Sequence, residues 1–195
     1  MGLRGYQPNQ STLDPANPPG RYSHPLPCYL GIDAGAAGGW ALLDQAGEIM
    51  GCGIGDQGFL ATVKKCQVAR AALEQVTGFR GEGEAKGHRI HKLMEDYGRW
   101  QGRLEALGIE THLVPAPTWK RYHQLQIKAG LGAAVGWPKL KLIKRDMILD
   151  RARLLFPSAP LSRKKDDGVA VALLLADYAR FGGTGGASFR RGRAR

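Results

Sequence analysis

The sequence predicts an α/β domain built on a mixed sheet, in which three antiparallel strands are followed by parallel strands and helices flank the sheet. Apolar segments at residues 28–33, 39–43 and 47–54 are separated by short glycine-containing turns, and tight turns join antiparallel strands. Two further strand-like segments, 69–76 and 110–114, lie beyond longer connections that carry helical patterns. Such connections are typical of parallel strands, so the sheet is expected to change direction after its third strand.

Helices are predicted from apolar residues that recur every three or four positions. The clearest case is residues 90–107, where Tyr97, Trp100 and Leu104 share the repeat. The other expected helices are 59–67, a short one opened by Pro117, a basic amphipathic one at 140–156, and an apolar, buried one at 166–181. The polar, glycine-rich stretches 77–89 and 128–138 are predicted to be loops, the first of them mobile.

Both ends of the chain differ in composition from the part between them. Residues 1–26 are rich in proline, asparagine, serine and glycine, and residues 182–195 are mainly glycine and arginine. Neither composition buries enough apolar surface to offset chain entropy. We therefore predict a flexible arm over 1–26, one folded domain over 27–181, and a flexible tail over 182–195 whose arginines would add nonspecific affinity for phosphates.

The charge balance indicates an anionic partner. The chain has 28 lysines and arginines against 17 aspartates and glutamates, a formal net charge of +11. This favours nucleic acid first and an anionic membrane surface second, while general solubility is the plainest alternative. No apolar run reaches the roughly 18 residues that read as a membrane-spanning helix, so no membrane partner is expected.

The cysteines predict a reducing compartment. Cys28, Cys52 and Cys66 are odd in number and form no C-x-x-C pair, so we interpret them as free thiols. The expected location is therefore the cytoplasm, ahead of an organelle.

Two carboxylates interrupt apolar strand segments. Asp33 ends the first predicted strand just before a glycine-rich turn, at the strand end where ligands bind in α/β sheets; alternatively it caps its own turn. Glu74 lies within the run 71–76, where a buried charge needs a partner or a metal. The alternative for Glu74 is a register that turns it to solvent.

Two more carboxylates, Asp166 and Asp167, precede the last apolar helix. Either could be its N-cap, and Lys164 and Lys165 beside them could make the pair a solvated charge cluster. If the fold brings these aspartates together with Asp33 and the carboxylate at position 74, the set of hard oxygen ligands suits Mg²⁺ or Mn²⁺ rather than zinc. Two such ions per active site would support phosphodiester hydrolysis.

Four segments, taken together and in order, resemble the RuvC family of Holliday-junction resolvases, in particular its phage and chloroplast members. They are residues 29–35 with the glycines that follow, 73–76, 113–120 and 165–178. The first alone is also similar to actin-like ATPases and sugar kinases, whereas the four in sequence run through nearly all of the predicted domain. The resemblance implies a ribonuclease H-like fold and a crossover junction endodeoxyribonuclease that depends on a divalent metal.

The resemblance also implies roles for individual residues. Asp33 and Glu74 match the first two metal ligands of the family, and Asp167, with or without Asp166, matches the third. Lys120 matches a basic residue placed near the scissile phosphate. The sequence departs from the pattern at Val171, where members usually carry another carboxylate one helical turn beyond the third ligand, and this puts full cleavage activity in doubt.

A basic and aromatic stretch follows the fifth predicted strand. Basic side chains engage phosphates, and exposed aromatic rings stack on unpaired bases. Trp119 is expected in the core, and Trp137 is the better stacking residue because it lies in a predicted glycine loop. The residues expected to contact DNA are Lys120, Arg121, Lys128, Trp137, Lys139, Lys141, Lys144 and Arg145.

The resemblance implies a two-fold dimer that acts on a four-way DNA junction. The predicted helix 90–107 carries Gly98 and Gly102 on one face, which would permit close helix approach, although ordinary packing on the sheet explains the spacing equally well. Three alternatives to a junction resolvase stay open. They are a junction-binding protein with weakened or lost cleavage, another nuclease of the same fold, and, least favoured because the chain is short for two lobes, an actin-like phosphotransferase.

Overall fold

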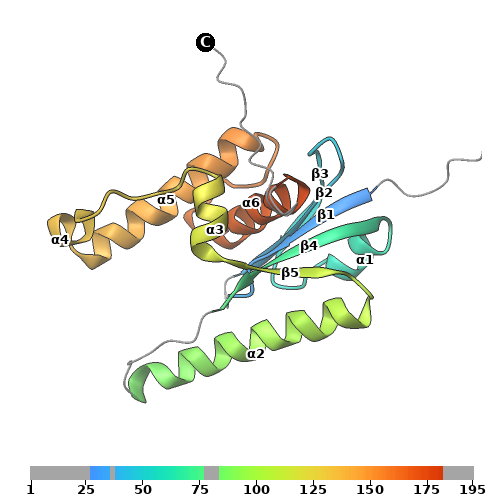
Figure 1. The fold of residues 1–195 in the computed structure, drawn as a ribbon, viewed down its shortest axis with the longest axis horizontal. Helices are drawn as coiled ribbons and strands as arrows, with labels where there is room; N and C mark the ends of the chain where they lie inside the picture. Colours follow the sequence, from blue (N-terminus) through green and yellow to red (C-terminus); the bar gives the residue numbers. More distant parts are fainter. Residues whose placement is uncertain (1–26, 36–37, 77–83, 182–195) are drawn as a thin grey trace, which may run out of the picture.

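The computed structural model describes residues 27–35, 38–76 and 84–181, apart from the side chains of 84–89. The predicted arm over 1–26, the predicted tail over 182–195 and residues 77–83 of the predicted first loop lie outside this part. The described residues confirm the predicted fold class, a mixed α/β sheet flanked by helices (Figure 1).

Five strands form one sheet in the order β3-β2-β1-β4-β5. β1 pairs antiparallel with β2, and β2 with β3, while β1 with β4 and β4 with β5 are parallel pairs. The predicted change of strand direction is therefore confirmed, and it occurs at β1. The strand bounds are β1 Pro27–Ile32, β2 Gly39–Leu43, β3 Ile49–Ile54, β4 Gln67–Gln75 and β5 Thr111–Pro115.

Two of the predicted loops are partly helical. The bounds are α1 Phe59–Val63, α2 Glu84–Ala106, α3 Ala116–Tyr122, α4 Leu131–Val135, α5 Trp137–Leu155, the 3-10 turn η1 Lys164–Asp166, and α6 Asp167–Phe181. Residues 84–89 are helical, so the predicted loop is wrong there; they lack an apolar repeat, but several are good helix formers. α4 lies inside the second predicted loop, and α5 starts at Trp137, with a positive-φ glycine before it and proline in its first turn.

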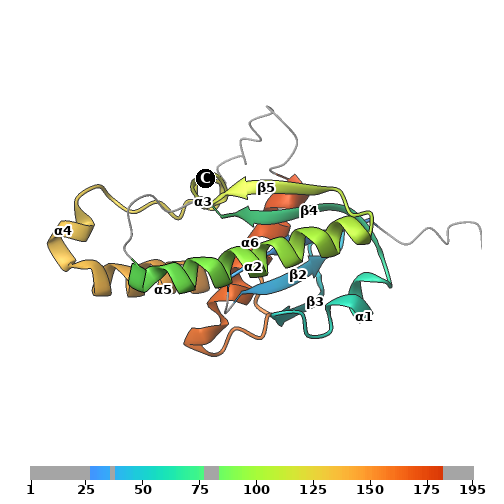
Figure 2. The same cartoon turned by 90° about the horizontal axis from the view of Figure 1, so that it is seen from below.

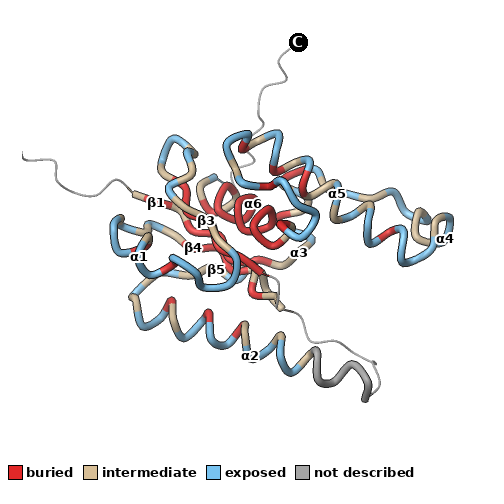
Figure 3. Tube along the Cα trace, turned by 180° about the vertical axis from the view of Figure 1, so that it is seen from behind, coloured by how far each residue is buried: buried red, intermediate tan, exposed pale blue. Residues whose placement is uncertain are grey.

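The helices cover both faces of the sheet. α6 packs on one face with α5 outside it, and its apolar residues join those of β2 in one cluster. On the other face, Tyr97, Trp100 and Leu104 of α2 pack with α1 and the alternate residues of β1 and β2. Figure 2 shows α2 along its face of the sheet, and Figure 3 shows α6 buried through most of its length. No helix among the described residues has both the length and the apolar character needed to cross a membrane.

Candidate active site

The sheet itself brings Asp33 and Glu74 together. Parallel pairing sets Ile32 of β1 opposite Leu73 of β4, so the next residue of each chain segment is a carboxylate. Ile32 and Leu73 both point to the α2 face. Because side chains alternate across a strand, the two carboxylates are directed to the other face, where α6 begins.

Asp33 forms the turn-capping hydrogen bond that the sequence offered as the alternative to a ligand role. Its Oδ1 accepts a hydrogen bond from the Gly35 backbone N–H at 3.1 Å, so it does cap its own turn. Burial and then the charge of Glu74 raise the pKa of Asp33 from 3.8 to about 7, and Asp167 adds to this. The Gly35 hydrogen bond and the Lys120 charge oppose the rise. Asp33 is thus a carboxylate whose negative charge the folded protein accommodates poorly without a cation.

Two residues of α3 act on the Glu74 side chain. Burial raises its pKa, while the Lys120 charge and a hydrogen bond from Trp119 lower it. The indole Nε1 of fully buried Trp119 donates that bond to Glu74 Oε1 at 3.3 Å. The prediction that Trp119 belongs to the core is confirmed, and its hydrogen bond to the carboxylate is a positioning contact that the sequence did not indicate.

Asp166 and Asp167 have separate environments. Asp166 is 1% exposed, and Arg163 forms an ion pair with it at 2.8 Å and also donates a backbone N–H to it. These contacts lower its pKa. Asp167, the first residue of α6, is the aspartate whose charge acts on Asp33. The oxygens of Asp166 therefore close the turn before α6, whereas the charge of Asp167 reaches Asp33.

Replacing Asp166 by asparagine is expected to lower the free energy of unfolding at neutral pH by about 2–3 kcal/mol, the range for hydrogen bonds to a charged group. Since its pKa is lowered in the folded state, its contribution is complete above the ordinary value of 3.8 and disappears as the pH falls through the folded value. Urea unfolding at pH 7 and pH 3 measures both effects. Asp150→Asn is the control, because the Asp150 side chain is 74% exposed in its ion pair and its replacement should change the free energy of unfolding little. Equal losses of stability in the two variants would contradict the assignment.

Asp33 and Glu74 line an open cleft of about 300 Å³ at the carboxyl ends of β1 and β4. Its walls include Asp33, Glu74, Gln75, Leu93 and Ala116. Within the described residues, no group of three or more histidine, cysteine or acidic side chains is arranged to bind a metal ion. Mg²⁺, however, commonly takes one or two carboxylates and completes its shell with water and substrate phosphate. Two adjacent carboxylates, one with a pKa raised to about 7, fit such an ion.

Val171 lies one turn into α6 beyond Asp167 and belongs to the apolar cluster under the sheet, 8% exposed. Positions four apart in a helix share a face, so this side chain lies next to the site and supplies no ligand. The site therefore lacks the further carboxylate that the resemblance to the RuvC family implies at this position.

The residues expected to contact DNA lie on α3, on α5 and between them. Lys120 and Arg121 belong to α3, and Trp137 starts α5 with 77% of its surface exposed. Lys144 Nζ lies 5.9 Å from the Trp137 ring centroid, and Lys141 lines a shallow hollow with both. Lys128, Lys139 and Arg145 line neither this hollow nor the cleft. α4 and the first half of α5 project from the body of the protein (Figure 1).

Gly98 and Gly102 do not contact the sheet. A Cβ built at either position would meet nothing within 4 Å, and both residues are exposed on α2. Packing on the sheet, the alternative explanation of the spacing, therefore does not account for the pair.

The strand order, with helices on both faces, is consistent with the ribonuclease H-like arrangement that the sequence motifs imply. No protein-family model matches the chain, and no curated protein matches it in sequence. Among solved structures, T. thermophilus RuvC in complex with Holliday junction substrate is similar at 13% identity and a TM-score of 0.46, over 80% of this chain and 96% of that chain. A likeness of this degree carries no information on activity.

Proposed function

We propose that the protein is a structure-selective endodeoxyribonuclease that resolves Holliday junctions by divalent-metal-dependent phosphodiester hydrolysis. The observation that supports it best is the pair Asp33 and Glu74, adjacent at one sheet edge and acted on by Lys120, with Asp167 close enough to raise the pKa of Asp33. Convergence of acidic side chains from two strands and a helix N-terminus, beside a cation, suits the handling of a phosphodiester.

Each residue has a role in the proposal. Asp33 and Glu74 would hold Mg²⁺ or Mn²⁺, with Asp167 as the third carboxylate near it and Asp166 left to Arg163. When bound, the ion activates a water and stabilises the leaving oxygen. Trp119 would hold Glu74 in place through its hydrogen bond. Lys120 would neutralise the scissile phosphate as a compact cation. Three carboxylates suffice for one ion, so a second would depend on the substrate phosphate as a shared ligand.

The basic residues of α3 and α5 would bind the arms of the junction through phosphates. A homodimer would supply one active site to each of two symmetric strands, and the exposed Gly98 and Gly102 face of α2 is open for that contact. We propose in addition that residues 27–181 form the nuclease domain, and that the protein acts in the cytoplasm of a bacterial or phage-infected cell.

A second function is favoured by one observation. Because Val171 offers no ligand where a carboxylate would complete the set, the protein could bind junctions with weakened or lost cleavage. Another nuclease of the same fold would share the carboxylates but not the preference for branched DNA.

Cleavage of a synthetic four-way junction with Mg²⁺, beside linear duplex and an Asp33→Asn control, tests the proposal. We expect symmetric nicks that need the metal, and a rate roughly a thousandfold lower in the variant. Tight junction binding without cleavage would favour the binding protein, and Val171→Asp should then restore nicking. Equal cleavage of the junction and the linear duplex would exclude junction resolution.

A further inference from the structure

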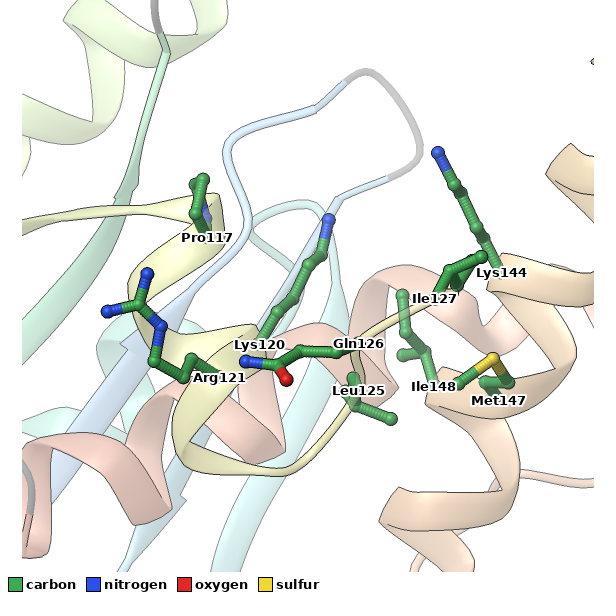
Figure 4. Close-up of a pocket in the computed structure, with 9 residues that line it drawn as sticks. All are labelled: Pro117, Lys120, Arg121, Leu125, Gln126, Ile127, Lys144, Met147 and Ile148. Carbon is green, nitrogen blue, oxygen red and sulfur yellow. The ribbon is translucent and has the colours of Figure 1, made fainter. Parts of the chain in front are cut away.

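A second cavity lies between α3 and α5, distinct from the carboxylate cleft. It encloses about 360 Å³, within the range of roughly 300–1,000 Å³ found for small-molecule sites. Figure 4 shows its walls, with α3 on one side, α5 on the other and the connecting segment between them. The lining residues are Pro117, Lys120, Arg121, Leu125, Gln126, Ile127, Lys144, Met147 and Ile148.

The lining has two kinds of side chain. Leu125, Ile127, Met147 and Ile148 are aliphatic and half-buried. Three cations share the same cavity, and in Figure 4 the amines of Lys120 and Lys144 extend from its opposite sides in the same direction. A purely apolar guest would gain nothing from three cations, and a free anion would gain nothing from the aliphatic surface. The cavity therefore suits a flat, largely apolar group attached to phosphates.

Lys120 joins this cavity to the candidate active site. Its charge acts on both Asp33 and Glu74, and its side chain also lines the cavity. Lys144 joins the cavity on its other side to the hollow that contains the exposed Trp137. A DNA strand with a phosphate at Lys120 would therefore have a neighbouring nucleotide at the mouth of the cavity.

We propose that this cavity holds one unstacked nucleobase of the strand whose phosphate lies at the carboxylates, and that Gln126 selects the base. The inference rests on the proposed nuclease function and names a specificity site for it. An amide has a donor and an acceptor side by side and can form two hydrogen bonds with adenine, so adenine is the expected base. Extraction of a base from the stack costs a few kcal/mol, which the already distorted strands of a junction reduce.

The test uses the full chain with Asp33→Asn, so that DNA stays intact, and junctions that carry 2-aminopurine at successive positions around the scissile phosphate. This base has its amine at C2 instead of C6, so its fluorescence reports whether a base enters the cavity and not which base Gln126 selects. The fluorescence of this base is quenched by stacking, and no aromatic side chain lines the cavity. We expect fluorescence to rise at one position on binding. Ile148→Phe, which fills the cavity, should abolish the rise and also lower the affinity for the junction, because a phenylalanine that only quenched a bound base would leave the affinity unchanged. Leu154→Phe, at a 71% exposed residue of the same helix, should change neither.

Gln126→Leu gives an independent readout, because residue 126 is exposed and its replacement does not disturb packing. Junctions with different natural bases at the identified position should differ in affinity by about tenfold in the parent and become nearly equal in this variant. A rise that persists in Ile148→Phe, or tight junction binding with no rise at any position, would overturn the base site and leave the nuclease proposal intact. If junctions do not bind, single-stranded oligonucleotides with 2-aminopurine replace them: a rise that depends on Ile148 keeps the base site, and its absence overturns it.

Discussion

In metal-free buffer, Asp33→Asn is expected to raise the free energy of unfolding at pH 8 by about 2–4 kcal/mol. Burial, and then the charge of Glu74, raises the pKa of Asp33 from 3.8 to about 7 in the folded protein. Between these two values the folded chain binds more protons than the unfolded chain, so stability falls as the pH rises through this window. The penalty is absent below about pH 4 and complete above about pH 7, and asparagine removes it.

Urea unfolding at pH 4 and pH 8, with EDTA present, measures the difference between the two proteins. Asp146→Asn, on the exposed surface of α5, controls for the loss of one charge. Addition of Mg²⁺ at pH 8 should then stabilise the wild type and have much less effect on Asp33→Asn, because a ligand that binds only the folded state shifts the equilibrium toward it. Parallel pH profiles for the wild type and Asp33→Asn would show that residue 33 carries no repelled charge, and a metal site there would lose its support.

The sheet could be predicted from the sequence because its signals are local. Short apolar segments and tight glycine-containing turns identified β1, β2 and β3, and the long connections identified the parallel strands. The start of α2 could not be predicted, since residues 84–89 carry no apolar repeat. They extend a helix that packs only farther along, at Tyr97 and beyond. Helix α4 is five residues long, too short for a periodic pattern.

The candidate site was predictable to the extent that strand ends determine it. Asp33 directly follows β1 and Glu74 is the next-to-last residue of β4, and these two parallel strands end on the same side of the sheet. The separation of Asp166 from Asp167 was not predictable, because it depends on Arg163 and on where the turn η1 gives way to α6. The cavity between α3 and α5 depends on how two helices pack, and no spacing along the chain encodes that packing.

Gly31→Ala is expected to lower the free energy of unfolding by about 3 kcal/mol or more, at the upper end of the range for overpacked cores. Gly31 lies in the central strand where α6 crosses it, and an added Cβ would overlap the backbone at Ala172 and Ala176, with the Leu175 carbonyl carbon at 2.9 Å. Backbone atoms cannot turn aside as side chains do, so β1 and α6 must separate.

Gly98→Ala, with open space around it in α2, should instead stabilise the protein by about 0.5–1 kcal/mol. Urea unfolding followed by circular dichroism distinguishes the two, and a change below about 1 kcal/mol at Gly31 would contradict the close contact. Because Asp33 follows β1 and Asp167 begins α6, the same separation should also weaken the effect of Asp167 on the pKa of Asp33, so this glycine connects the packing of the core to the geometry of the site.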